Sequence, residues 1–101
     1  MQVVGKGKLQ DFWKKHNPAK SSLERWFDIT KETNWSSWPK LKMSFPSADM
    51  VKTKNGNFVV FNIGGDKYRL VTKIDFSEAI VVVEIVMTHP EYSKNRWKDK
   101  L

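Results

Sequence analysis

The chain has 101 residues, enough for one domain spanning residues 1–101 with its own core. It has no cysteine, which excludes disulfides, thiolate nucleophiles and cysteine-ligated zinc, and its two histidines alone make a poor metal site. Eighteen Lys and Arg against eleven Asp and Glu give a net charge of +7, which favours a polyanionic partner: RNA, DNA, a membrane surface or an acidic protein.

Residues 1–32 predict a short edge strand followed by two helices. The apolar residues 1–4 form the strand. The first helix is indicated by four side chains at helical spacing: Leu9, Phe12, Trp13 and His16. Asn17 and Pro18 are typical of the cap and first residue of a second helix. Its buried face is expected to hold Leu23, Trp26, Phe27 and Thr30.

Residues 34–51 predict an irregular connection or short helical turns, and strands follow. Asn55-Gly56 favours a hairpin with a type I′ turn, because both residue types tolerate a positive φ, and it leads into a strand over 58–63. A second turn at 64–66 leads into a strand over 67–74. The run 80–87 is apolar on both faces except for Glu84, as in a strand inside a covered sheet.

The tail, residues 89–101, is polar and basic, with Trp97 as its one large apolar anchor. The element order predicts an α+β fold in which two N-terminal helices pack on one face of a mainly antiparallel sheet of about four strands. No apolar run is long enough to cross a bilayer, and the N-terminus lacks the apolar core of a signal peptide, so we expect a cytoplasmic protein.

A cationic strand face is the first candidate for chemistry. Residues two apart on a strand share a face, so the predicted strand places Lys67, Arg69 and Lys73 on one side. The other side carries Tyr68, Leu70, Thr72 and Ile74. The cationic row could hold a phosphate backbone, with the planar guanidinium of the arginine suited to a reacting phosphate. An ordinary solvated strand face is the alternative.

His89 and Tyr92 are the second candidate, because they follow the central strand three residues apart. An imidazole transfers protons near neutral pH, as a hydrolytic or transesterifying site requires. A structural histidine at the strand end is the alternative. The aromatic residues could be base-stacking platforms, although most sit at core spacing; Trp35, Trp38 and Phe45 are the open cases.

The run FNIGGDKYRLVTKI, residues 61–74, followed by VMTHPEY, residues 86–92, resembles the HigB-type toxins of the RelE superfamily. The resemblance extends more loosely over the LQDFWKKH start, the tryptophan-containing second helix and the LKMSFPSAD segment. It implies a small α+β ribonuclease that enters the decoding site of the ribosome and cuts translated messenger RNA. It also implies a helix-turn-helix antitoxin of the HigA type as the partner that silences it.

Such enzymes resemble metal-free ribonucleases, in which the ribose 2′-OH attacks the adjacent phosphate, so no cofactor is expected. By this resemblance Arg69 would stabilise the pentacovalent phosphate and His89 would transfer a proton, while Tyr92 would orient the scissile nucleotide or share the transfer. Lys73 is counted with these three as a catalytic residue, and Lys73 and Lys67 would bind the phosphates on either side of the reacting one. Weaker candidates for contacts to messenger or ribosomal RNA are Lys42 and Lys54.

Two other functions share the charge and the aromatic content. A non-catalytic RNA-binding module has no need of a histidine and a tyrosine close to a cationic strand. A regulatory DNA-binding protein is disfavoured, because neither early helix looks like a recognition helix and no turn of helix-turn-helix type joins them.

Overall fold

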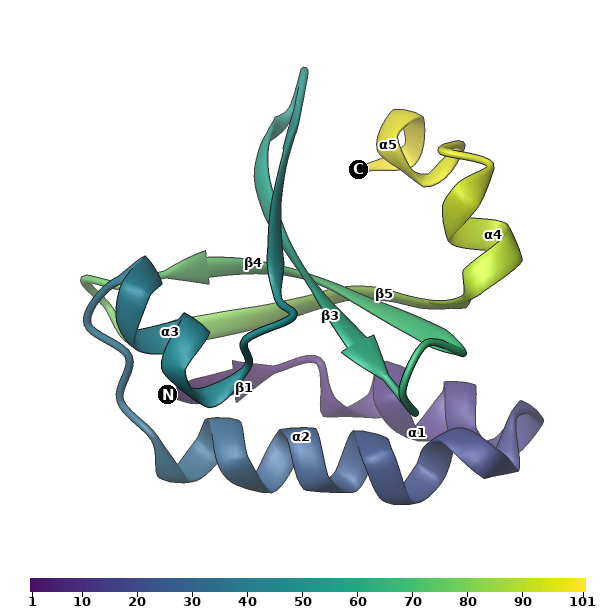
Figure 1. The fold of residues 1–101 in the computed structure, drawn as a ribbon, viewed down its shortest axis with the longest axis horizontal. Coiled ribbons are helices and arrows are strands. Elements are labelled where there is room, and N and C mark those ends of the chain that lie inside the picture. The colour runs from purple at the N-terminus through teal and green to yellow at the C-terminus, as the bar shows by residue number, and fades with distance from the viewer.

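A five-stranded sheet with helices on both faces forms the centre of the computed structural model, which describes residues 1–101 (Figure 1). The strands are β1 (Gln2–Val4), β2 (Asp49–Thr53), β3 (Gly56–Ile63), β4 (Tyr68–Asp75) and β5 (Ile80–Thr88). The helices are α1 (Lys6–Lys15), α2 (Lys20–Glu32), α3 (Trp38–Ser44), α4 (His89–Ser93) and α5 (Trp97–Lys100), with a 3-10 turn η1 (Asn17–Ala19) before α2. None of these helices is both long and apolar enough to cross a bilayer.

The strand order is β1-β5-β4-β3-β2. Strands β2 to β5 are antiparallel neighbours, and β1 adds a short parallel edge to β5. The α+β class is therefore confirmed, with the predicted edge strand as the fifth member of the sheet. The pairing of β3 with β4 places Asn62 opposite Arg69, and the pairing of β2 with β3 places Asp49 opposite Val60. Polar residues of three neighbouring strands therefore lie at one end of the sheet.

The larger core lies between the sheet and the helices α1 and α2. Leu9 and Leu23 are fully buried, and Trp26 meets Phe61 of β3 edge to face at a centroid distance of 5.4 Å. The predicted stripes of both helices thus face the sheet. Asn17 does not cap α2 with its side chain; it opens the 3-10 turn instead.

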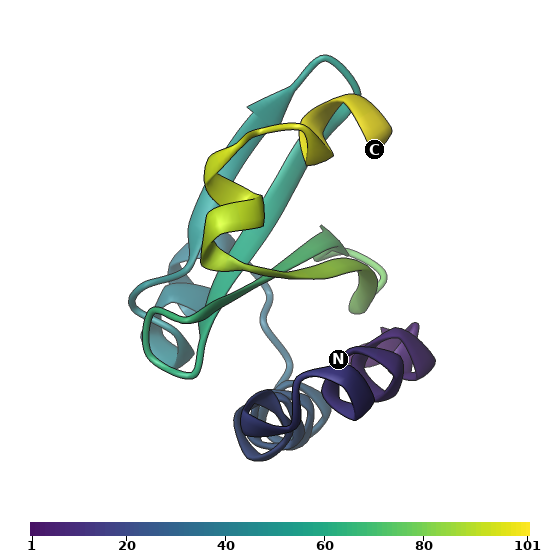
Figure 2. The same cartoon turned by 90° about the vertical axis from the view of Figure 1, so that its right-hand side faces the viewer.

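The prediction that the two N-terminal helices pack on one face of the sheet is confirmed. The opposite face is covered by the C-terminal tail, whose two short helices were not predicted. Figure 2 shows α4 and α5 on this side, next to the β2–β3 hairpin. Trp97 is 3% exposed and packs with buried side chains of three strands: Phe58, Val60, Val71 and Met87. Helices of four and five residues are too short to show helical periodicity in a sequence.

The connection between α2 and β2 contains a third helix. Ser37 caps α3, its hydroxyl accepting a bond from the Lys40 backbone N–H. Of the three open aromatic residues, Trp35 is buried and Phe45 packs against it at 5.8 Å, while Trp38 is half-buried. The first two are therefore core residues.

Both predicted hairpin turns are present, but the first is not of type I′. Its loop residues are Lys54 and Asn55, and only the following Gly56 has a positive φ, of 114°. The Thr53 hydroxyl accepts the Asn55 backbone N–H at 3.0 Å, which holds the loop without a left-handed asparagine. In the second turn Gly64 and Gly65 have φ values of 63° and 70°.

Candidate active site

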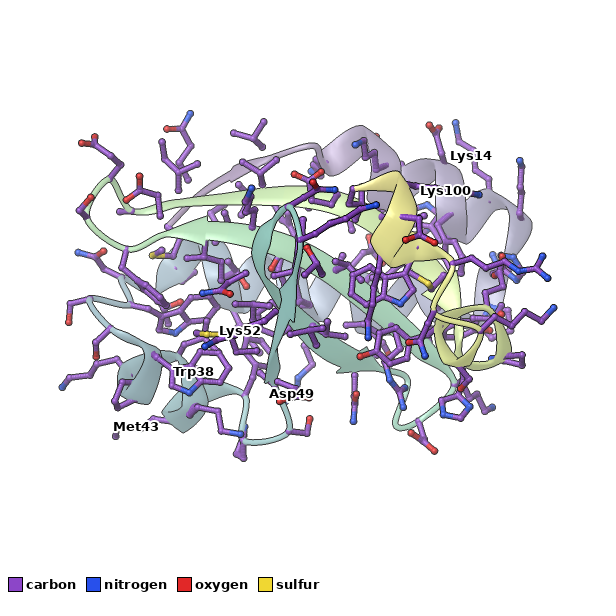
Figure 3. The ribbon with its side chains drawn as sticks, turned by 90° about the horizontal axis from the view of Figure 1, so that it is seen from above. Lys14, Trp38, Met43, Asp49, Lys52 and Lys100 are labelled. Atoms are coloured by element: carbon purple, nitrogen blue, oxygen red, sulfur yellow. The ribbon has the colours of Figure 1, made fainter.

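A cavity of about 370 Å³ lies where β2, β3 and β4 meet α4. Its walls come from α3, from the segment before β2, from three strands and from α4: Lys42, Ser47, Ala48, Asp49, Val60, Asn62, Arg69 and Tyr92. Asp49 can be found in Figure 3 at the foot of the hairpin. Three residues expected to act on RNA, Arg69, Tyr92 and Lys42, are thus brought together.

Arg69 is the most constrained charged residue of the cavity, with a side chain only 10% exposed. One terminal nitrogen, Nη1, donates to the backbone carbonyls of Asp66 at 3.2 Å and Tyr68 at 3.1 Å. The other, Nη2, donates to the Asp66 carboxylate at 2.7 Å. A guanidinium has five N–H groups. The Nε–H and the second Nη2–H therefore have no partner in the structure, and this edge of the fork is available to a phosphate.

Tyr92 forms an aromatic wall beside this arginine. The Arg69 guanidinium carbon lies 5.6 Å from the centre of the phenol ring, which in turn stacks on Trp97 at 5.5 Å. Burial raises the pKa of the Tyr92 hydroxyl, as does the charge of Asp49, while the charge of Arg69 opposes the shift. The phenol therefore stays protonated at neutral pH and can donate a hydrogen bond.

Asp66, in the β3–β4 turn, holds the arginine in place. The hydrogen bond from Arg69 lowers the pKa of the Asp66 carboxyl, and the arginine charge lowers it further, with a smaller contribution from His89. The carboxylate therefore remains charged well below neutral pH. The Asp66 carboxylate bonds only one side of the Arg69 guanidinium. It therefore holds the guanidinium in one orientation and leaves the edge with the Nε–H free.

Lys42 contributes a second cation to the cavity. Its ammonium donates to the carbonyl of Pro46 at 2.5 Å and to that of Ala48 at 2.9 Å. These bonds tie α3 to the segment before β2. An ammonium carries three N–H groups, so one is left for a ligand.

His89 does not line the cavity. It is exposed and opens α4, where its backbone N–H donates to the carbonyl of Lys67 at 2.9 Å. The Thr88–Glu91 capping box fixes the start of this helix. Lys67 is exposed in the turn before β4, because this strand begins one residue later than predicted. The backbone bond to Lys67 places His89 one residue from Asp66, which holds Arg69 in the cavity.

Lys73 and Lys54 lie at the other end of the sheet, near the tip of the β2–β3 hairpin. The Lys73 ammonium donates to the Asn55 carbonyl at 3.3 Å. At about 3.3 Å per strand residue, the backbone of Lys73 lies roughly 13 Å along β4 from that of Arg69. Lys54 lies 4.0 Å from the carboxylate of Asp99. The predicted continuous cationic row is therefore not present, since buried Val71 separates its two ends.

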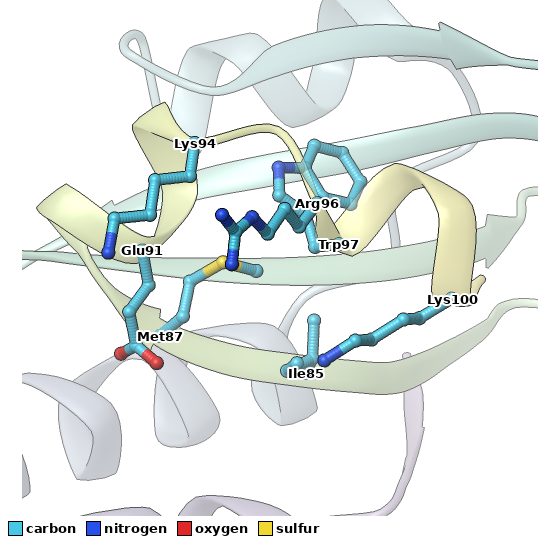
Figure 4. A pocket seen from close by; sticks show the side chains of 7 residues that line it. All are labelled: Ile85, Met87, Glu91, Lys94, Arg96, Trp97 and Lys100. Atoms are coloured by element: carbon cyan, nitrogen blue, oxygen red, sulfur yellow. The ribbon is translucent and has the colours of Figure 1, made fainter.

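Asp49, Asn62 and Asp66 belong to the site but were not among the residues predicted from the sequence. The register of the two hairpins is the signal that could have found the first two, because it places them beside Val60 and Arg69. A separate cavity of about 220 Å³ lies between β5 and the tail, with Lys94, Arg96 and Lys100 at its rim (Figure 4). None of the predicted site residues lines it. No group of three potential metal ligands is present.

Comparison with known proteins gives a consistent set of relatives. Residues 19–95 match the model of the HigB_toxin family, described as the RelE-like toxic component of a toxin-antitoxin system. The chain is 26% identical over 94 residues to an mRNA interferase HigB of Escherichia coli O6:H1, covering 93% of this chain and 90% of the relative. It is 29% identical over 92 residues to the mRNA interferase toxin HigB of Escherichia coli K12, covering 91% and 88%.

Proposed function

This chain belongs to the HigB family of RelE-like toxins of toxin-antitoxin systems, and we propose that it is an endoribonuclease that cleaves translated messenger RNA on the ribosome. Relatives that span nine-tenths of its length are named mRNA interferases. The net charge of +7 suits a polyanionic substrate. The observation that carries the proposal is the Arg69 guanidinium, held by Asp66 and two carbonyls with one N–H edge free at a cavity.

The proposed reaction is an internal transesterification. The ribose 2′-OH attacks the adjacent phosphorus, the bond from phosphorus to the 5′-oxygen breaks, and the products are a 2′,3′-cyclic phosphate and a 5′-OH. Negative charge builds up on the phosphate oxygens in the transition state, where the free edge of Arg69 would bind them. A preorganised donor of this kind contributes about 2.7 to 4 kcal/mol by analogy with an oxyanion-hole donor.

Two protons must move in this reaction, one from the 2′-OH and one to the leaving 5′-oxygen. His89 is the proposed proton-transfer group, because imidazole exchanges protons near neutral pH. Tyr92 stays a protonated phenol, which supports a role in donating to the phosphate or the leaving oxygen and in stacking on the scissile nucleotide. His89 would reach the phosphate from the start of α4, beside the turn that carries Asp66.

The lysines separate into near and distant groups. Lys42 lines the cavity and would bind the phosphate next to the scissile one. Lys67 in the β3–β4 turn, and Lys73 and Lys54 near the hairpin tip, would contact messenger or ribosomal RNA farther away. Contacts of the second kind add affinity that falls with salt but do not touch the reacting atoms.

Membership of a toxin-antitoxin family implies an antitoxin partner. We propose a helix-turn-helix protein of the HigA type that covers or distorts the cavity, and a cytoplasmic site of action on the bacterial ribosome. We also propose that residues 1–101 act as one toxin domain, since both apolar clusters use the same sheet. Co-expression of the antitoxin should then restore growth that the toxin alone arrests.

The experiment is cleavage of messenger RNA on programmed ribosomes by the purified protein, with and without prior treatment of the protein with a chelator that is removed before the ribosomes are added. Ribosomes need Mg²⁺ to stay assembled, so the chelator must not reach them. We expect cuts in the translated region with 2′,3′-cyclic phosphate ends and an unchanged rate after the treatment. Ribosome binding without cleavage would favour the non-catalytic RNA-binding module instead. Loss of activity after the treatment would refute the metal-free route.

A further inference from the structure

We propose that the cavity beside Arg69 binds a nucleobase carrying an exocyclic amino group, and that Asp49 is the residue that selects it. This inference rests on the proposed ribonuclease function and names what the same site recognises. It starts from the presence of an acidic side chain in a cavity that otherwise suits an anion: Lys42, Arg69 and Asp49 share its walls.

Asp49 has no partner that explains its position. It is the first residue of β2, exposed and opposite Val60, and it takes part in neither of the two ion pairs of the structure nor in any side-chain hydrogen bond. Its charge is nevertheless felt by Tyr92 across the cavity, whose pKa it raises. A carboxylate among phosphates is unfavourable unless it meets a donor. An ionised carboxylate only accepts hydrogen bonds, so a ligand here must present N–H or O–H groups.

The rest of the cavity suits a flat heteroaromatic ring. Its volume of about 370 Å³ accommodates a purine or a pyrimidine. Val60 and Ala48 are buried apolar residues of the lining, and Tyr92 supplies a ring for stacking. Asn62, opposite Arg69 on β3, adds an amide with both donor and acceptor groups. Unstacked RNA bases are bound in this way, by aromatic stacking together with hydrogen bonds to their edges.

The four bases differ in what they would present to Asp49. Adenine, cytosine and guanine each carry an exocyclic amino donor. Uracil carries no amino group, and its one N–H donor lies between two carbonyl oxygens that repel a carboxylate. Matched base contacts discriminate by about 1 to 3 kcal/mol, which corresponds to roughly 5- to 150-fold. Uracil should therefore be disfavoured on this scale at one position next to the cut.

The test measures single-turnover cleavage on programmed ribosomes with messages in which each decoding-site position in turn is A, C, G or U. The wild-type protein should cut poorly when one particular position is U. Asp49→Asn, whose amide can also donate, should bring the ratio of amino-bearing bases to U at that position toward one. Asp28→Asn, an exposed change on α2 across the sheet, is the matched control and should leave the ratio unchanged.

Two results would overturn the inference while the ribonuclease function stands. One is an unchanged ratio for Asp49→Asn with cleavage at the wild-type rate. The other is an unchanged ratio with an equal loss of cleavage at all four bases, which would place Asp49 in proton transfer.

Absence of wild-type cleavage would refute the proposed function instead, and base binding can still be tested on the free protein. Nuclear magnetic resonance titrations with 5′-mononucleotides should show tighter binding of AMP, CMP or GMP than of UMP, with shifts at Tyr92 and Asn62. Equal or tighter binding of UMP would overturn the inference. Equal melting temperatures of the two variants and the wild type would exclude misfolding.

Discussion

Replacing Trp97 by alanine should release the C-terminal tail from the sheet. The indole is 3% exposed, stacks on Tyr92 at 5.5 Å and meets Phe58 edge to face at 6.2 Å. A buried tryptophan removes about 150 to 250 Å² from water, worth about 4 to 6 kcal/mol at about 25 cal/mol per Å². Measured tryptophan-to-alanine changes cost about 3 to 5 kcal/mol, and we expect a loss in this range. Cleavage should fall too, because Tyr92 loses the ring that supports it.

The assay is urea unfolding followed by circular dichroism, with Trp97→Phe as the matched variant. Phenylalanine keeps an aromatic ring against Tyr92 and Phe58, and it removes an indole N–H that is buried without an acceptor. Its loss of stability should therefore be clearly smaller than that of alanine. An alanine variant within about 0.5 kcal/mol of the wild type, as for surface substitutions, would refute the packing of the tail described above.

Three further predictions test other parts of the structure. Hydrogen bonds from Arg69 to Asp66 and from the Thr88 backbone to Glu91 hold the pKa values of these two carboxyls below their usual range. The stability that the two charged carboxylates contribute is therefore present above about pH 4 and is lost on acidification. The double variant Asp66→Asn with Glu91→Gln should flatten the acid branch of a plot of melting temperature against pH. His89→Gln cannot transfer a proton and should slow single-turnover cleavage by about 10² to 10⁴ at an unchanged melting temperature, whereas a wild-type rate would remove it from the mechanism. Gly64→Ala forces a side chain to φ 63° and should cost about 1 to 2 kcal/mol in urea unfolding; an unchanged midpoint would contradict the left-handed turn.

The N-terminal helices and the sheet could be predicted from the sequence because each is long enough to show its period. Leu9 and Leu23 lie on apolar stripes that face the sheet, as the helical spacing indicated. Strand alternation also placed Tyr68 and Leu70 together on one face of β4, which is the face that packs against α1 and α2. These elements are fixed by local patterns of burial that a single sequence displays.

The covering of the second sheet face could not be predicted in the same way. It depends on two helices of four and five residues, which contact the strands and, through the stack of Tyr92 on Trp97, each other. Trp97 was expected to anchor the tail, but the sequence alone does not show which strands it packs against. The same tail supplies Tyr92, so the wall of the cavity depends on it as well.

Register explains which site residues were found and which were missed. Taking Asn55 and Gly56 as the two loop residues would place Asp49 opposite Asn62, whereas the loop is one residue earlier and Asp49 lies opposite Val60. Either register keeps the two polar residues on the face that carries Arg69. Lys73 was expected next to this arginine because it shares the face, but distance along the strand separates them.

The most direct test of the account is Arg69→Lys on programmed ribosomes, with cleavage and ribosome binding measured on the same sample. Lysine keeps the charge but lacks the fork that meets Asp66 on one edge and a phosphate on the other. Single-turnover cleavage should fall by about 10² to 10³, the loss expected for one transition-state donor, while co-sedimentation with ribosomes persists. Arg25→Lys, exposed on α2, is the matched control and should cleave at the wild-type rate. Wild-type cleavage by Arg69→Lys, or an equal loss of cleavage and binding, would contradict the role of Arg69 at the reacting phosphate.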